Sequence, residues 1–181
     1  MEFHSEKPRL LPWKGVMPSV ADDAFVAPSV TIIGDTEIGS MASIWFNVVL
    51  RGDVNFIRIG ARTNIQDGTI VHVASQGPPT IIGQGVLVGH LAMIHACNLD
   101  DGCFIGMSAV VMDGVVVETG AMVAAGALVP PGKRVGAGQL WAGTPAKYVR
   151  DTTEEERSSF STQIQRYVDL GQTYRGLTAE R

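Results

Sequence analysis

Aliphatic side chains recur at every sixth position through most of the chain. One series runs through Val26, Ile32, Ile38, Ile44 and Leu50, and a later one through Ile105, Val111, Val117, Val123, Val129 and Val135. A period of six is typical of short strands joined by tight turns, with one aliphatic side chain per strand pointing into a shared interior. Three hexapeptides make one triangular coil, and successive coils stack about 4.8 Å apart. The pattern therefore predicts an all-β solenoid, a parallel β-helix.

Three departures from the period of six predict where the solenoid is irregular. The step from one aliphatic residue to the next is nine over residues 50–59, eleven over 71–82 and five over 94–99. An insertion has to leave the coil at a corner, so we expect outward bulges at the first two places. The third place is a one-residue deletion, which the coil has to absorb locally.

Near the C-terminus the pattern changes to that of an α-helix. Thr153 and Glu156 have the spacing of a capping box. Aromatic and aliphatic residues follow at helical spacing, at Phe160, Ile164, Tyr167 and Tyr174. We expect an N-terminal segment over 1–22, the β-helix over 23–150, and a C-terminal helix and tail over 151–181. The helix is expected to cover a side or an edge of the prism.

Composition and charge narrow the classes of function. The chain of 181 residues has 14 basic and 18 acidic residues, a net charge of -4, and no basic cluster, so nucleic acid is not an expected partner. The first residues lack the apolar run of about 7 to 15 residues that a signal peptide needs, and no segment reaches membrane-spanning length. Two cysteines, Cys97 and Cys103, are too few for a disulfide framework. We therefore expect a cytoplasmic protein with no membrane partner.

Three of the four histidines fall on the repeat, while His4 lies near the N-terminus. His72 and His95 each directly follow an aliphatic residue, and those two aliphatics are three hexapeptides apart. The two imidazoles therefore occupy the same face one coil apart, where they can share one metal ion. His90 follows Val88 by two and belongs to the preceding face. It cannot complete their site within one chain.

A threefold homotrimer resolves this mismatch. The face that carries His90 on one subunit can meet the face that carries His72 and His95 on its neighbour, which generates three equal sites. The same register places Arg51 one coil before His72 and Asp67 one coil before His90, so these two are expected to pair across the interface. A lone histidine is most often an ordinary hydrogen-bonded group. The convergence of three, with an open coordination position, is what indicates a catalytic zinc-type site.

Three segments carry a resemblance to a known family: IWFNVVLRGD, IGARTNIQDGTIVH and GHLAMIHACNLDDGCFIGMSAVV. They resemble gamma-class carbonic anhydrases and their relatives known as hexapeptide transferases or ferripyochelin-binding proteins, over about residues 15–150. The resemblance implies a left-handed β-helix. It also implies a metal held by the residues that match His72 and His95 of one subunit and His90 of the next.

The resemblance extends to residues around the metal. Those matching the family's interface ion pairs are Arg51, Asp53 and Asp67. Asn64 and Gln66 match residues of the pocket, with Gln66 near the metal-bound water, and Tyr167 matches a helix tyrosine that reaches the site. Structural explanations stay open: Asn64 could occupy a corner with left-handed backbone, Asp53 could turn the chain at the first bulge, and Tyr167 could be a helix packing position.

The implied activity is the reversible hydration of carbon dioxide to bicarbonate, the reaction of a carbonate dehydratase. A divalent metal, zinc first, with iron(II) or cobalt as alternatives, would lower the pKa of its water toward about 7 and give hydroxide for the attack. The chain departs from well-studied members in two places. Val54 stands where they have an acidic residue, and the bulge over 74–79 carries no carboxylate. Because those acidic groups transfer protons, we expect weak turnover.

Two other functions compete with this one. The first is a coenzyme A-dependent acyltransferase, because hexapeptide prisms host many of these and the segment 143–147 resembles their C-terminal coil. Such enzymes usually employ one histidine as a base, without a set of three. The second is a trimeric scaffold or thioester-handling relative that retains the metal but has negligible carbonic anhydrase activity.

Overall fold

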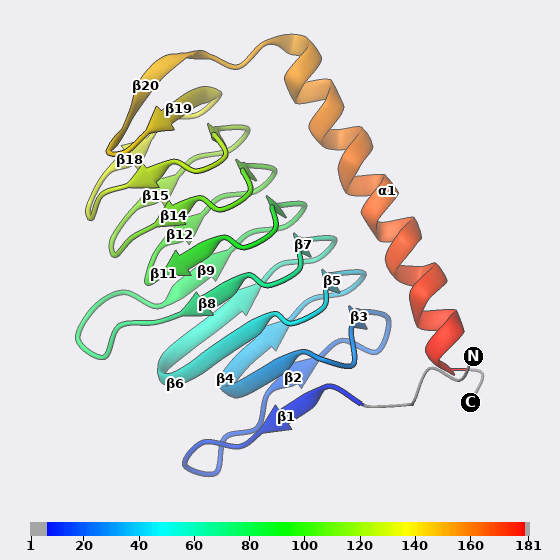
Figure 1. The fold of residues 1–181 in the computed structure, drawn as a ribbon. Coiled ribbons are helices and arrows are strands. Elements are labelled where there is room, and N and C mark those ends of the chain that lie inside the picture. The colour runs from blue at the N-terminus through cyan, green and yellow to red at the C-terminus, as the bar shows by residue number, and fades with distance from the viewer. Residues whose placement is uncertain (1–6, 180–181) are drawn as a thin grey trace.

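The structure is a computed structural model and describes residues 7–179, so His4 lies outside the described residues. The chain winds into a left-handed parallel β-helix with one long helix along its side (Figure 1). Three stacks of strands form its faces. Face 1 comprises β1 (Arg9–Leu11), the first parts of β4 (Thr31–Ile38) and β6 (Val49–Ile59), β8 (Ile70–His72), β11 (Met93–His95), β14 (Val110–Val111) and β17 (Leu128–Val129).

The other two faces complete each coil. Face 2 comprises β2 (Ser19–Val20), the last parts of β4 and β6, β9 (Thr80–Ile82), β12 (Asn98–Leu99), β15 (Val116–Val117) and β18 (Arg134–Val135). Face 3 comprises β3 (Phe25–Val26), β5 (Ser43–Ile44), β7 (Asn64–Ile65), β10 (Leu87–Val88), β13 (Phe104–Ile105), β16 (Met122–Val123), β19 (Gln139–Gly143) and β20 (Ala146–Asp151). The strands within each stack are parallel, except that β20 runs antiparallel to β19.

The core consists of the aliphatic series that the sequence shows. On face 1, Leu50 pairs in register with Val71, Val71 with Ile94 and Ile94 with Val111, and all four side chains are fully buried. Like residues therefore stack on like from coil to coil, which confirms the predicted period of six. The fold follows from this stacking, because each added coil buries one aliphatic side chain per face.

The irregular places lie where the period breaks. Strand β6 pairs with β4 through the first corner. Between Gly52 and Ile57, the four residues 53–56 lie opposite the single residue Asp35 of β4, so the strand holds three extra residues. The second insertion forms the loop over 73–79 between β8 and β9. At the deletion the turn after His95 is shortened, and Ala96 adopts a φ of 46° in it.

The stacking of strands begins before residue 23, the expected start of the β-helix, and ends at Asp151, next to the expected end at residue 150. Strands β1 and β2 pair in parallel with β4, although both precede residue 23. At the other end the hairpin of β19 and β20 forms the last part of the face 3 sheet. Helix α1 (Glu154–Ala179) follows β20 directly.

Helix α1 begins with the predicted capping box. The backbone N–H of Glu156 donates to the hydroxyl of Thr153 at 3.1 Å, and the N–H of Thr153 donates to the Glu156 carboxylate at 2.8 Å. The helix then runs back along face 3 (Figure 1). Its Phe160 stacks on Phe104 with ring centroids 4.9 Å apart, so the predicted cover of a sheet is confirmed. Within residues 7–179, no helix combines the length and apolar character needed to cross a bilayer.

Candidate metal centre

Strands β8 and β11 bring two imidazoles together on face 1. His72 pairs in register with His95 on the next coil and with Arg51 on the previous one, as the sequence predicts. The Nδ1 atom of His72 lies 3.1 Å from the Nε2 atom of His95. Both side chains point outward from the prism because each follows an inward aliphatic residue. The β-ladder therefore fixes their separation.

The remaining nitrogen of each ring is hydrogen-bonded to a carboxylate. His72 Nε2 lies 3.2 Å from Asp53 Oδ1, and His95 Nδ1 lies 2.6 Å from Asp113 Oδ1. A neutral imidazole has one N–H, so if each ring donates it to its aspartate, the two facing nitrogens both carry lone pairs. Metal–nitrogen bonds of about 2.0–2.1 Å at a tetrahedral angle place two nitrogens about 3.3 Å apart. The pair thus fits a shared divalent ion.

Local electrostatics keep the donor set suited to a metal. Burial lowers the pKa of His72, outweighing the hydrogen bond that the ring donates to Asp53, and so favours the neutral imidazole. Burial acts to raise the pKa of Asp53, but hydrogen bonds from Arg51 and His72 outweigh it and hold that carboxyl below its ordinary value. A neutral imidazole beside an ionised carboxylate is the arrangement found around metal-bound histidines.

His90 lies apart from this pair, in the turn that leads from β10 on face 3 to β11 on face 1. Its Nδ1 atom is 2.9 Å from Asp67 Oδ2, in the corresponding turn of the previous coil, and both side chains are partly exposed. Within the described part of a single chain, no three His, Cys, Asp or Glu side chains gather as a metal site. The mismatch that the sequence predicts between His90 and the other two histidines is therefore present.

The charged residues near the site pair within the chain. Arg51 Nη1 is 2.6 Å from Asp53 Oδ2, so Asp53 bridges Arg51 and His72. Asp53 lies in the irregular stretch of β6 over residues 53–56, where the strand holds the inserted residues. The expected pairing of Arg51 with Asp67 joins two subunits and stays a prediction.

Asn64 and Gln66 form a buried polar chain on face 3. Gln66 Nε2 donates to Asn64 Oδ1 at 3.0 Å, and Asn64 Nδ2 donates to Ser43 Oγ at 2.9 Å. Asn64 lies in strand β7, and the left-handed residues of this coil are Arg62 and Gly68. The interpretation of Asn64 as a left-handed corner residue was therefore wrong. The hydrogen-bond chain orients the Gln66 amide so that its Oε1 faces away from Asn64.

Tyr167 projects from α1 toward face 3, where it joins an aromatic cluster. Its ring meets Trp45 edge-on at 6.0 Å, and the ring of Tyr174 also meets Trp45 edge-on, at 5.2 Å. Tyr167 thus lies on the same face as Asn64 and Gln66, while His72 and His95 are on face 1. Within residues 7–179, the buried indole Nε1 of Trp45 has no hydrogen-bond partner.

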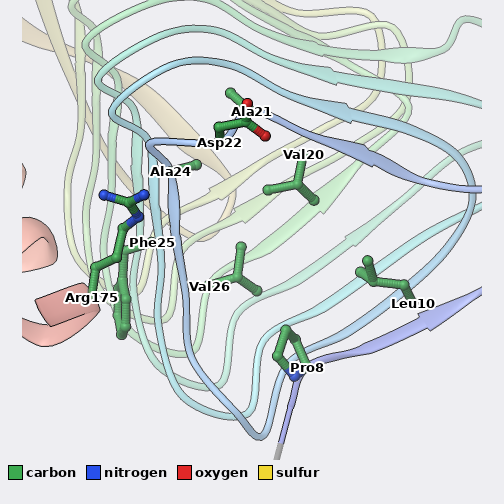
Figure 2. A pocket seen from close by; sticks show the side chains of 9 residues that line it. All are labelled: Pro8, Leu10, Val20, Ala21, Asp22, Ala24, Phe25, Val26 and Arg175. Carbon is green, nitrogen blue, oxygen red and sulfur yellow. The ribbon is translucent and has the colours of Figure 1, made fainter. Parts of the chain in front are cut away.

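Sequence reasoning missed Asp113, which contacts His95. It follows Val111 by two, one coil beyond His95, so the repeat register carried the signal that could have found it. An open hollow of about 270 Å³ lies elsewhere, at the first coil (Figure 2). Its lining is largely apolar, with Leu10, Val20 and Phe25 on its walls and Arg175 at one side. The histidines take no part in it.

Comparisons with known proteins find similar chains, although no family model matches this one. It is 45% identical to a protein named carbonic anhydrase from Geobacillus kaustophilus, over 95% of this chain and 94% of that one. It is 50% identical to gamma carbonic anhydrase 2, mitochondrial, of Arabidopsis thaliana over 87% of its length, but spans 58% of that longer protein. A crystal structure of a hexapeptide transferase family protein from Anaplasma phagocytophilum matches with 48% identity and a TM-score of 0.88, over 92% of this chain and 98% of that one.

Proposed function

Because the chain belongs to the gamma-class carbonic anhydrase-like family of hexapeptide-repeat proteins, we propose that it is a carbonate dehydratase. Its site would catalyse the reversible hydration of carbon dioxide. The observation that carries the proposal is the facing pair of His72 Nδ1 and His95 Nε2 at 3.1 Å. If the N–H groups of the two rings are donated to Asp53 and Asp113, the facing nitrogens both carry lone pairs, which repel one another unless a cation lies between them.

The ligands would be His72 and His95 of one subunit and His90 of the next. A divalent ion held by three imidazoles lowers the pKa of a coordinated water to about 7 and so supplies a nucleophile at neutral pH. Zinc is the first choice for such a nitrogen set, and iron(II) or cobalt suit it also. The residues Asp53 and Asp67 contact His72 and His90 and would hold these rings in place.

A homotrimer is supported by the outward residues of face 1. From β6 to β17 they form an unbroken apolar row of Val49, Ile70, Met93, Val110 and Leu128, whereas the first two coils carry Arg9 and Thr31 at this position. The corresponding row on face 2 is Glu37, Arg58, Ile81, Asn98, Val116 and Arg134. A charge-free row beside the histidine pair suits burial against another subunit, whereas charged residues on face 2 suit water.

The partner that face 1 would receive is the corner bearing His90 on a second copy of the chain. Leu91 next to His90 is 67% exposed, and Met107 in the turn above is 55% exposed. This corner therefore offers apolar side chains around a histidine, matching the apolar row around His72 and His95. The Arg51 and Asp67 side chains would meet at the same interface.

Gln66 and Tyr167 would serve the substrate. Because the Nε2 group of Gln66 donates its hydrogen bond to Asn64, the Oε1 atom is left to accept a hydrogen bond from the attacking water. This hydrogen bond would direct the water's lone pair toward carbon dioxide. Asn64 acts by holding Gln66. The hydroxyl of Tyr167, from the helix over the same face, would donate to an oxygen of carbon dioxide or bicarbonate.

Two alternatives remain to be separated by experiment. The name of the Anaplasma neighbour favours group transfer, and a hexapeptide acyltransferase would use coenzyme A with one histidine as base. A metal-retaining scaffold or thioester-handling trimer is the other. We place the protein in the cytoplasm, since Cys97 and Cys103 are buried free thiols.

Elemental analysis combined with a carbon dioxide hydration assay tests the proposal. Protein purified without air should contain about one divalent ion per subunit and hydrate carbon dioxide above background. Full metal with no hydration at any buffer concentration would favour the scaffold. Absence of metal together with acyl transfer from a coenzyme A thioester would favour the acyltransferase.

A further inference from the structure

Asp113 lies in the turn after β14, one coil beyond the candidate metal ligand His95. Its Oδ1 atom is 2.6 Å from His95 Nδ1, within hydrogen-bond distance of the ring. The turn below it is the one shortened by the deletion, with the carbonyl of Ala96 accepting from the N–H of Gly114 at 2.8 Å. The side chain of Asp113 thus reaches down the stack to the imidazole.

The two histidines offer different nitrogens to one another. His72 presents Nδ1 and His95 presents Nε2, and in each ring the opposite nitrogen is held by an aspartate. In a neutral histidine, a hydrogen-bond acceptor beside one ring nitrogen holds the proton there and leaves the lone pair on the other nitrogen. If the proton of His95 sat on Nε2 instead of Nδ1, the ring's lone pair would be on Nδ1. It would then point toward Asp113 and away from His72.

We propose that Asp113 is a positioning residue that holds His95 in the Nδ1–H tautomer and so aims its Nε2 lone pair at the metal. This inference rests on the proposed function, because it takes His95 as a ligand. A carboxylate behind a ligating histidine raises the ring's basicity and fixes its orientation, and its loss typically costs 10- to 100-fold in metal affinity.

The turn itself does not need the Asp113 carboxylate. Its left-handed position is occupied by Gly114, with a φ of 69°, and its backbone is held by hydrogen bonds to the coils on both sides. Asp101 offers a contrast, since it also precedes a glycine in a turn, Gly102 with a φ of 66°. The Asp101 carboxylate accepts the N–H of Gln84 at 2.8 Å and serves the turn. Asp113 instead uses its carboxylate on an imidazole.

Asp113 also differs from Asp53, which contacts the other ring. The Asp53 carboxylate is shared between His72 and Arg51, so its loss would disturb a charge network as well as a histidine. Asp113 has its ion pair with His95. Substitution of Asp113 therefore probes the imidazole with less disturbance of neighbouring charges.

The test compares Asp113→Asn with the matched control Asp101→Asn in the full-length assembled protein. Zinc affinity, measured by competition with a chelator, should fall 10- to 100-fold in Asp113→Asn and stay within twofold of the unsubstituted protein in Asp101→Asn. Asp113→Glu, which keeps the charge and an acceptor, should recover part of the loss. In ¹⁵N-histidine spectra of the metal-free protein, His95 should carry its proton on Nδ1, and Asp113→Asn should shift the population toward Nε2–H.

Unchanged affinity and an unchanged His95 tautomer in Asp113→Asn would overturn the inference. Should that variant fail to assemble, the spectrum of the unsubstituted zinc-loaded protein decides: a metal-bound shift at His95 Nδ1 rejects the proposal, and one at Nε2 supports it. The variant His95→Ala distinguishes a failure of the proposed metal site from a failure of the proposed role of Asp113. Metal retained in His95→Ala defeats the metal site itself, whereas metal lost there but kept in Asp113→Asn defeats only the role of Asp113.

Discussion

His72 and His95 face each other across one coil step, with Nδ1 of the first 3.1 Å from Nε2 of the second. This contact is a product of the backbone, because the two residues are partners in a parallel β-ladder whose neighbouring strands are about 4.8 Å apart. A solenoid therefore offers a pair of ligands wherever two histidines occupy the same position in consecutive coils. The third ligand has to come from elsewhere.

Removing any one imidazole should empty the site. We expect His72→Ala, His90→Ala and His95→Ala each to lower metal content sharply, because two remaining ligands leave an incomplete shell. The aliphatic core does not involve these side chains, so far-ultraviolet circular dichroism should be unchanged. Elemental analysis of dialysed protein gives the readout. Full metal in His90→Ala would remove that residue from the site.

A charge placed on face 1 should break the assembly. Ile70 lies in the apolar row of face 1 and is 36% exposed, whereas Ile81 has a similar exposure of 39% on face 2. We expect Ile70→Arg to shift the proposed trimer toward monomer, since a guanidinium cannot be buried in an apolar interface without a partner. Light scattering measures the mass, and Ile81→Arg is the control that should remain trimeric. Dissociation by Ile81→Arg alone would move the interface to face 2.

Proton export should limit the turnover. Val54, beside Asp53 in β6, is 46% exposed and cannot accept a proton, and the loop over 73–79 carries no carboxylate. We expect imidazole buffer to raise kcat, because a diffusible base replaces the missing one, while kcat/KM changes little. Val54→Glu should lessen the dependence of kcat on buffer. Stopped-flow hydration assays check both effects. A kcat independent of buffer in the unsubstituted protein would show that another relay exists.

The hydroxyl of Tyr167 can be separated from its ring. Tyr167→Phe keeps the edge-on packing against Trp45, so the free energy of unfolding should stay within about 0.5 kcal/mol. If the hydroxyl donates to the substrate, kcat/KM should fall about 5- to 10-fold, the equivalent of one hydrogen bond worth about 1 kcal/mol. Hydration kinetics and urea unfolding give the two readouts. An unchanged rate assigns Tyr167 to packing alone.

The start of helix α1 should respond to acid. The paired hydrogen bonds from Arg150, followed by that from the Thr153 backbone, lower the pKa of Glu156 from 4.5 to about 2. A carboxyl with a depressed pKa in the folded state stabilises that state above its unfolded pKa and loses this effect as the pH falls toward its folded pKa. Glu156→Gln keeps the cap but removes the charge. Its urea midpoint should be lower than that of the unsubstituted protein at pH 6, and the difference should shrink between pH 4.5 and about 2.

A control variant, Glu155→Gln, tests whether the pH-dependent change in stability arises from Glu156. Glu155→Gln changes a neighbouring acidic residue of the same first turn, for which the structure gives no ion pair. Its midpoint difference from the unsubstituted protein should be smaller at pH 6 than that of Glu156→Gln. A difference for Glu156→Gln that stays constant from pH 6 to about 2 would contradict the role of the charge.

The hexapeptide repeat made the face and the coil of each side chain predictable. Because each position in the hexapeptide has a fixed direction, Val71 and Ile94 determined that His72 and His95 share a face, and Val88 set His90 apart. Thr153 and Glu156 likewise predicted the start of α1, since a capping box depends on local backbone alone. These inferences needed no knowledge of how distant segments meet.

The parts that failed depend on tertiary contacts. The alternative explanation of Asn64 as a left-handed corner residue was wrong, because Asn64 precedes the inward Ile65 and lies in a strand, where Ser43 and Gln66 satisfy its amide. The register places Asp113 one coil beyond His95, but it does not specify that the two side chains meet across the shortened turn. Whether Arg51 prefers Asp53 or Asp67 depends on a second subunit.

Helix α1 and the solenoid beside it have nearly commensurate periods. A helix rises 5.4 Å per turn, while successive coils are about 4.8 Å apart, so one turn of a slightly tilted helix advances by one coil. The inward residues follow this rule: Phe160 meets Phe104 of β13, Ile164 lies near Gly85 before β10, and Tyr174 meets Phe25 of β3. The length of the helix therefore matches the number of coils that it covers. An extra coil of eighteen residues could be accommodated only with roughly one more helical turn, about 3.6 residues, so the lengths of the two elements are constrained to change together.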